Sequence, residues 1–168
     1  ASHELINAAL IKLRPEIPVL SEEGVTAEMG DLLQVDMYWA VDPLDGTKEF
    51  INGYPDYTVN IALVSDGEPR LGVICVPETG VLYAGVADYQ AYRVERDNPD
   101  ERQELKHSAV SEQREQRMAA VSRSHLNDKT EAVLEALGVE DVKKFGSSLK
   151  ICAVAEGQVD VYPRLGPT

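Results

Sequence analysis

The feature of this sequence that most constrains its fold is a series of short apolar segments in the middle of the chain. Four segments of strand length, rich in β-branched residues, are separated only by short turns: residues 58–65, 71–76, 81–86 and 91–94. The first turn contains Asp66-Gly67, a dipeptide typical of tight β-hairpins. Since strands joined by tight turns pair antiparallel, this region predicts an antiparallel meander.

The pattern changes after residue 105, where expected strands alternate with expected helices. The strands are predicted at residues 118–121, 142–145 and 159–162, and the helices at residues 128–137, capped by Asp128, and from the turn 146–148 to residue 156. We therefore expect an α/β (α+β layered) protein, an alternating helix-sheet sandwich. Its predicted parts are an N-terminal domain over residues 1–105 and a partial C-terminal α/β domain over residues 106–168. The charged segment 95–104 is the expected boundary or exposed linker.

The pattern of apolar residues in the N-terminal part predicts one helix followed by two strands. Apolar residues recur at helical spacing from Ser2 to Arg14, and Pro15 ends the pattern. Residues 17–20 and 38–41 are apolar and short, which predicts strands. The polar stretch between them predicts a loop or a flap.

The net charge limits the kinds of partner that the chain can bind, and the cysteine pattern indicates the redox state of its thiols. The chain of 168 residues carries a formal net charge of -13, so its surface field repels nucleic-acid polymers and anionic membranes. No apolar run is long enough to span a membrane, and Cys75 and Cys152 form no CxxC pair, which favours reduced thiols. We expect a cytoplasmic protein with a small-molecule ligand, and the sequence leaves its oligomeric state open.

Two groups of carboxylates follow the two N-terminal strands. Asp42 and Asp45 lie in a turn rich in Pro and Gly, and Glu22-Glu23 follow the first strand. If the two strands are neighbours, these side chains gather at one sheet end, which is costly without a cation such as Mg2+. The alternative interpretation is that Asp-Pro and Asp-Gly are ordinary turn dipeptides and that Glu22-Glu23 are solvated loop charges.

A candidate anion site lies at the start of the last expected helix. Gly146-Ser147-Ser148 offers backbone N–H groups there, and Lys150 adds a cation in the first turn. Alternatively, one of these serines is an N-cap and Lys150 is a solvated charge.

Together these motifs resemble a known group of enzymes. Ser21-Glu22-Glu23 followed by the segment 39–47 resembles the lithium-sensitive, magnesium-dependent phosphatases of the inositol monophosphatase and fructose bisphosphatase superfamily. Segments 48–50, 58–63, 122–125 and 146–150 are most similar to the bacterial 3'(2'),5'-bisphosphate nucleotidases. Two parts of the family pattern are absent, a metal-ligand Asp in a Trp-Asp motif expected just after Thr168 and an Asp-bearing loop expected before Ala1. We therefore expect about two thirds of a family member.

The resemblance implies a role for each matching residue. The implied cofactor is two or three Mg2+ ions, and Li+ would inhibit the activity. The implied ligands of these ions are Glu22, Asp42, Asp45 and the carbonyl of Leu44. The implied catalytic residues are Glu22, Thr47 and Asp45, with Thr47 paired to Glu22 to orient the attacking water. The implied substrate-binding residues are Gly46, Thr47, Ser122, His125, Gly146, Ser147, Lys150 and Arg164. Inositol phosphatases have a Glu at the position of Arg164, and an Arg favours a second phosphate.

The function implied is hydrolysis of the 3'-phosphate of adenosine 3',5'-bisphosphate to AMP and phosphate, with activity on the 5'-phosphosulfate analogue and a place in sulfur assimilation. One alternative is a phosphatase for inositol or sugar phosphates. Another is a non-catalytic module that binds nucleotide or metal, and a third is a purely structural acidic protein. His125 has its own alternative as a locally packed loop residue.

Overall fold

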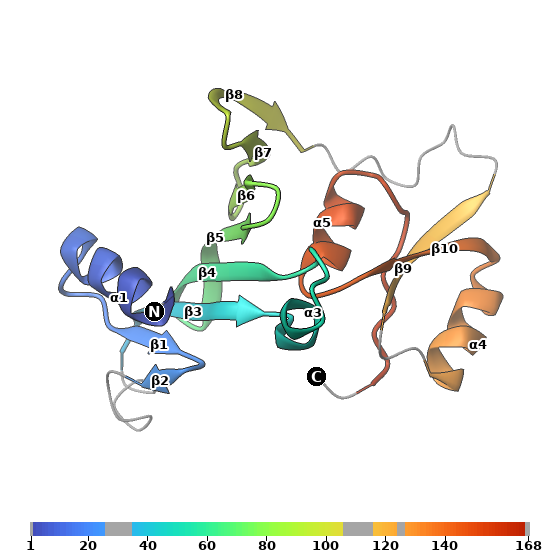
Figure 1. Ribbon diagram of the computed structural model, residues 1–168, viewed down its shortest axis with the longest axis horizontal. Coiled ribbons are helices and arrows are strands. Elements are labelled where there is room, and N and C mark those ends of the chain that lie inside the picture. Colours follow the sequence, from blue (N-terminus) through green and yellow to red (C-terminus); the bar gives the residue numbers. More distant parts are fainter. Residues whose placement is uncertain (1, 26–34, 106–115, 124–126, 167–168) are drawn as a thin grey trace.

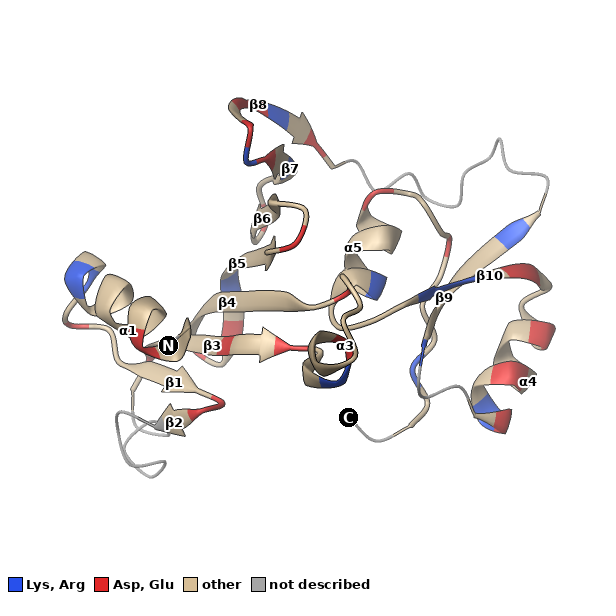
Figure 2. Ribbon diagram, viewed as in Figure 1, with Lys and Arg blue, Asp and Glu red and all other residues tan. Residues whose placement is uncertain are grey.

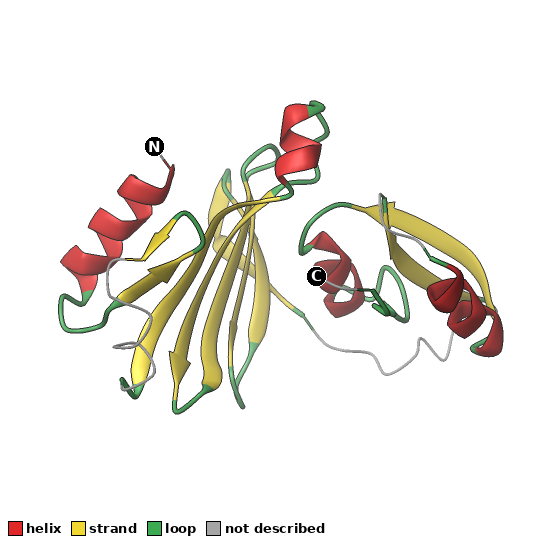
Figure 3. Ribbon diagram, turned by 90° about the horizontal axis from the view of Figure 1, so that it is seen from below, coloured by secondary structure: helices red, strands yellow, loops and turns green. Residues whose placement is uncertain are grey.

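The computed structural model describes residues 2–25, 35–105, 116–123 and 127–166, which form two units (Figure 1). The larger unit is an eight-stranded sheet with helix α1 (Ser2–Leu13) on one face. The smaller unit contains a two-stranded sheet, helix α4 (Asp128–Ala136) and helix α5 (Leu149–Ala155), and α5 lies between the two sheets (Figure 3). These layers confirm the expected mixed α/β class.

The large sheet contains the predicted meander. Its strands in spatial order are β2 (Gly24–Val25), β1 (Val19–Ser21), β3 (Met37–Asp45), β4 (Thr58–Ser65), β5 (Glu68–Val76), β6 (Val81–Val86), β7 (Ala91–Glu95) and β8 (Asn98–Glu104). β1 and β3 are parallel, and the other neighbouring pairs are antiparallel. Asp66 and Gly67 have φ angles of 55° and 76°, which suit a two-residue hairpin turn.

The expected linker at residues 95–104 is wrong, because most of it is strand β8. Every β8 residue is exposed, so the strand forms through backbone pairing with β7 and leaves no apolar pattern in the sequence. Pro99 is tolerated because β8 is an edge strand. The domain boundary predicted between residues 105 and 106 stays a prediction, because residues 106–115 lie outside the described part of the chain.

The expected turn at residues 42–47 is also wrong in its first part, since β3 continues to Asp45. The pairing of β3 with β4 shifts between Asp42 and Asp45, so the segment is a bulged strand end that accommodates Pro43. The chain then turns at Gly46, with φ of 89°, into the short helix α3 (Thr47–Ile51). A bulge re-aims side chains, and here it sets the directions of both aspartates.

Helix α1 supports the strands that end at the acidic residues. Its Leu10 joins a buried cluster with Val19, Trp39 and Val41. On its polar side, His3 Nδ1 lies 2.7 Å from Ser21 Oγ, at the end of β1. The helix therefore holds both β1 and β3 from one face. The helices of the described residues are all too short or too polar to cross a membrane.

The smaller unit is built on two parallel strands, β9 (Arg117–Ser122) and β10 (Val139–Phe145). Helix α4 is capped by Asn127, whose side chain accepts from Thr130 N at 2.9 Å, so the predicted Asp128 cap is wrong by one residue. The strand expected at residues 159–162 is reduced to a single bridge between Ala119 and Val161. Cys75 and Cys152 are free, as expected.

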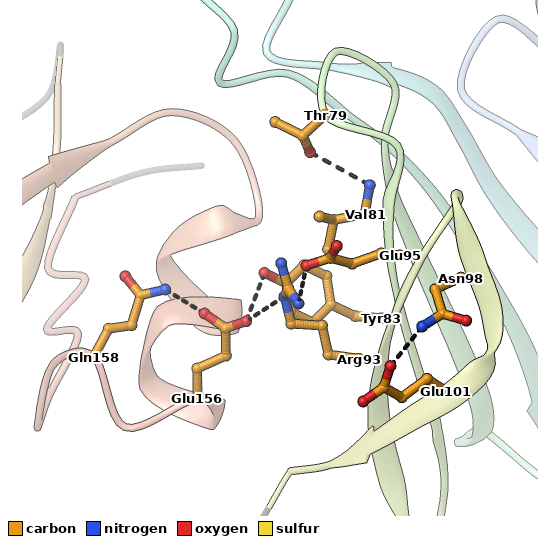
Figure 4. A network of polar contacts seen from close by, with 9 residues as sticks. All are labelled: Thr79, Val81, Tyr83, Arg93, Glu95, Asn98, Glu101, Glu156 and Gln158. Carbon is orange, nitrogen blue, oxygen red and sulfur yellow. Dashed lines mark hydrogen bonds and ion pairs between the residues drawn. The ribbon is translucent and has the colours of Figure 1, made fainter.

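A polar network ties α5 to the large sheet (Figure 4). Glu156, just after α5, accepts from Tyr83 Oη and from Arg93 Nε, both at 3.0 Å. Arg93 also pairs with Glu95 at 2.8 Å. Charge and a shared hydrogen-bond acceptor therefore dock the smaller unit on strands β6 and β7.

Candidate active site

The acidic residues after β1 and β3 lie side by side, as predicted. The two strands are parallel with Ser21 opposite Val41, so their carboxyl ends meet at one edge of the sheet. Glu22 N donates to Val41 O at 3.0 Å, which places Glu22 beside Asp42. Glu23 is exposed in the turn between β1 and β2.

Asp42 shows the electrostatic strain of this arrangement. Its pKa is raised to about 6, mainly by burial and also by the charges of Glu22 and Asp45 and a hydrogen bond with Glu22, against the lowering effect of the Leu44 amide. The Leu44 N–H donates to Asp42 Oδ1 at 3.0 Å. Crowded carboxylates of this kind are relieved by a cation.

The donor set suits a hard divalent cation, which prefers carboxylate and carbonyl oxygens. The carbonyl of Leu44 accepts from Thr47 Oγ1 at 3.3 Å, so Thr47 and this predicted ligand are neighbours. Asp45 Oδ2 accepts from Asn60 Nδ2 at 3.3 Å. Within the described ranges, three or more His, Cys, Asp or Glu side chains do not converge into a ready-made metal centre. The ligand roles and the pairing of Thr47 with Glu22 stay predictions.

A cleft of about 460 Å3 lies between the end of β3 and the smaller unit. Figure 2 shows acidic residues at the end of β3 and basic residues on the facing smaller unit. Six of the eight predicted substrate-binding residues line it, namely Gly46, Thr47, Ser122, Ser147, Lys150 and Arg164. Gly146 is buried next to this lining, and His125 lies outside the described residues. The structure thus brings together parts of the chain that are more than a hundred residues apart.

Lys150 is a buried cation of the cleft, so its interpretation as a solvated charge is wrong. Only 7% of the residue is exposed. Burial lowers its pKa, while nearby Asp45, Glu49 and Asp56 act in the opposite direction. Its ammonium group donates to the carbonyl of Ser147 and lies 5.6 Å from the centre of the Tyr162 ring.

Ser147 has two unusual features at the cleft wall. Its φ angle is 42°, a left-handed conformation that is uncommon for residues other than glycine. Its hydroxyl oxygen is buried without a hydrogen-bond partner in the described part of the chain. Strain and an unsatisfied polar atom at one residue are typical of a ligand site.

Asp56, which joins the two units through Gly146 and Arg123, was not predicted from the sequence. Asp56 Oδ2 accepts from Gly146 N at 3.1 Å and from the guanidinium of Arg123. The Arg123 guanidinium carbon also lies 5.0 Å from the centre of the Tyr54 ring. No local pattern marked Asp56, because it follows Pro55 in a segment with the composition of an ordinary loop.

Glu49 is a second missed residue. It lines the cleft beside Lys48, and its charge acts on Lys150 and Arg123. It lies in the short helix α3, next to Lys48, and no signal in the sequence separated it from a solvated charge.

The fold and this cleft, with carboxylates facing cations, match a known class of proteins. A profile of the inositol monophosphatase family matches residues 1–168, and the chain belongs to this family. Its members are metal-dependent. The chain is 44% identical over 169 residues to the 3'(2'),5'-bisphosphate nucleotidase CysQ of Salmonella typhimurium, in a match that covers 100% of this chain and 65% of that protein. It therefore spans slightly less than two thirds of this relative.

Solved structures show the same architecture. The crystal structure of CysQ from Bacteroides thetaiotaomicron, a bacterial member of the inositol monophosphatase family, matches with a TM-score of 0.83 and 40% identity, over 99% of this chain and 65% of that one. The 2'AMP-bound structure of SaIMPase-II matches with a TM-score of 0.73 and 26% identity, over 95% of this chain and 59% of that one.

Proposed function

We propose that the complete protein is a Mg2+-dependent phosphatase that removes the 3'-phosphate of adenosine 3',5'-bisphosphate to give AMP and phosphate. The observation that carries this proposal is the cleft, where Asp45 at the acidic sheet end faces the cations Lys150 and Arg164. A phosphate monoester needs both, since its anionic oxygens require cations and its hydrolysis requires an activated water. The nucleotidase relatives support the same substrate class.

Glu22, Asp42, Asp45 and the Leu44 carbonyl would hold the metal. When bound, Mg2+ supplies charge neutralisation at the phosphoryl group and lowers the pKa of water. Thr47 is held at the cleft by its hydrogen bond to the Leu44 carbonyl, from where its hydroxyl and Glu22 would orient the attacking water. The amides of Gly46 and Thr47 would stabilise charge on the phosphoryl oxygens.

The substrate side rests on the smaller unit. Lys150 and Arg164 line the same cleft, so one cation can bind each phosphate of a bisphosphate, and the guanidinium fork of Arg164 suits a terminal phosphate. Ser122, Ser147 and Gly146 would contact the sugar and phosphate oxygens, and His125 the nucleoside. Inhibition by Li+, the number of ions, activity on the 5'-phosphosulfate analogue, a cytoplasmic location and a place in sulfur assimilation belong to the same proposal.

The test is phosphate release by the complete gene product from adenosine 3',5'-bisphosphate, its 5'-phosphosulfate analogue and inositol 1-phosphate. We expect a clear preference in kcat/KM for the adenosine bisphosphate. Arg164→Glu should reduce that preference about tenfold or more, because a repulsive carboxylate replaces a bidentate phosphate ligand. An equal preference for inositol 1-phosphate in the unmodified protein would overturn the assignment of Arg164. Mg2+ binding without turnover on any of the three would favour a non-catalytic module.

A further inference from the structure

Ser148 occupies the N-cap position of α5 but does not cap it. Its side chain makes no capping hydrogen bond, although serine at this position ordinarily accepts from the first backbone N–H groups of the helix. Instead its hydroxyl faces β4, 2.9 Å from Asn60 Oδ1 and 2.8 Å from Thr58 Oγ1. Ser148 therefore contacts the large sheet and does not cap α5.

The donors and acceptors of these groups fix the direction of the hydrogen bond between Ser148 and Asn60. Ser148 has a single hydroxyl hydrogen, and Asn60 Oδ1 can only accept, so Ser148 donates to Asn60. Thr58 Oγ1 also has one hydrogen, which it can donate to Ser148 Oγ at 2.8 Å or to Asp45 Oδ2 at 3.5 Å, and the shorter distance favours Ser148. Ser148 therefore donates to Asn60 Oδ1, and Thr58 lies within hydrogen-bond distance of both Ser148 and Asp45.

The last step of this chain reaches a predicted metal ligand. With its oxygen turned to Ser148, the Asn60 amide points its Nδ2 at Asp45 Oδ2, 3.3 Å away. The flipped amide would bring Asn60 Oδ1 against the carboxylate oxygen of Asp45, an unfavourable pairing of two acceptors. Thr58 is fully buried, so water does not compete for the hydrogen bond between Thr58 and Ser148.

We propose that Ser148 is a positioning residue that orients the Asp45 carboxylate through Asn60. The inference rests on the proposed role of Asp45 as a metal ligand. Hydrogen-bonded partners of ligands orient them and tune metal affinity. Ser148 also lies directly between Ser147 and the first residues of α5, so the loop that would bind phosphate and the carboxylate that would bind metal share one hydrogen-bond chain. By linkage, anything that shifts this loop on binding changes the affinity for metal.

The experiment measures Mg2+ binding to the complete gene product by calorimetry without substrate, and then kcat and KM for adenosine 3',5'-bisphosphate. Ser148→Ala should weaken Mg2+ binding about tenfold and raise the Mg2+ concentration needed for half-maximal turnover. At saturating Mg2+, KM should change much less. Ser148→Thr keeps the hydroxyl and should retain most of the affinity, and Asn60→Ala, which removes the side chain between Ser148 and Asp45, should weaken binding at least as much as Ser148→Ala.

Ser65→Ala is the matched control, because it removes a serine hydroxyl at the opposite end of β4 that donates to Asp66 Oδ2 at 3.0 Å. It should bind Mg2+ as the unmodified protein does. Thermal melting in EDTA checks that each variant is folded. Unchanged Mg2+ affinity in folded Ser148→Ala would overturn the inference, as would equal losses in Ser148→Ala and Ser148→Thr. An unmodified protein that binds Mg2+ without releasing phosphate would contradict the proposed function alone, and one that binds no Mg2+ would contradict both.

Discussion

The carboxylate of Asp56 accepts a hydrogen bond from the guanidinium of Arg123, 67 residues further along the chain. The side chain of Asp56 is 14% exposed, and that of Arg123 is 34% exposed. Because the same oxygen of Asp56 also accepts from Gly146 N at 3.1 Å, one carboxylate connects the large sheet, the end of β9 and the loop before α5. The geometry of the cleft therefore depends on this residue.

Asp56→Ala should lower the free energy of unfolding by about 2 kcal/mol, since it removes the acceptor of two donors near the interior. The loop that carries Gly146 would also lose its anchor, so KM for the substrate should rise. Urea unfolding and steady-state kinetics measure the two effects. Asp97→Ala is the control, because the Asp97 side chain is 98% exposed, and a similar loss of stability in both variants would refute the account of Asp56.

Gly146→Ala should be destabilising by about 1–3 kcal/mol, because the added carbon overpacks a tight contact. A Cβ at Gly146 would lie 2.6 Å from the carbonyl oxygen of Asp56 and 2.7 Å from Glu49 Cγ. At Gly72 a Cβ would meet nothing within 4 Å, so Gly72→Ala should change stability little. Comparable unfolding curves for the two variants would show that the close approach at Gly146 is unimportant.

The raised pKa of Asp42 predicts that the stability of the metal-free protein depends on pH. Its pKa lies at about 6 in the folded state against an ordinary value of 3.8, so between these values the folded chain holds a proton that the unfolded chain has lost. This contribution therefore stabilises at low pH and is lost as the pH rises through about 6. In EDTA at pH 7, Asp42→Asn should be more stable than the unmodified protein, and the two should converge near pH 4. Mg2+ should stabilise the unmodified protein more than the variant. Parallel stability profiles in urea would contradict this.

The network around Glu156 predicts an effect on stability without an effect on the cleft (Figure 4). Glu156→Gln removes the charge that pairs with Arg93, whose side chain is 24% exposed, and should cost about 1 kcal/mol. Burial, followed by the charge of Glu156, raises the pKa of Tyr83, so the variant should also let Tyr83 ionise at lower pH. KM should stay unchanged, since none of these residues lines the cleft, and a large rise in KM would show that the docking of α5 controls the site.

Local sequence patterns were sufficient for most elements. The strand Thr58–Ser65 and its Asp66-Gly67 turn follow directly from β-branched residues and a turn dipeptide. Strand β8 could not be found this way, because an exposed edge strand buries no side chain and has no alternating pattern. The bulge between Asp42 and Asp45 was likewise invisible, since it depends on register against β4 and not on the residues of β3 alone.

The residues of the candidate site also fall into two groups, those that local motifs predicted and those that they did not. Residues in compact motifs, such as Asp45, Gly46 and Lys150, were predicted and lie together at the cleft. Asp56 and Ser148 act through contacts with residues about 90 positions away, and no spacing in one sequence encodes such distances. Long-range hydrogen bonds thus appear only once the two units are seen together.

The most direct test of the central claim is the release of phosphate from adenosine 3',5'-bisphosphate by the complete gene product, with and without Mg2+, beside the Asp45→Asn variant. The account predicts turnover only with Mg2+, its inhibition by Li+, and a loss in kcat/KM of at least about a hundredfold in Asp45→Asn. Turnover that persists in EDTA, or an Asp45→Asn variant as active as the unmodified protein, would contradict it.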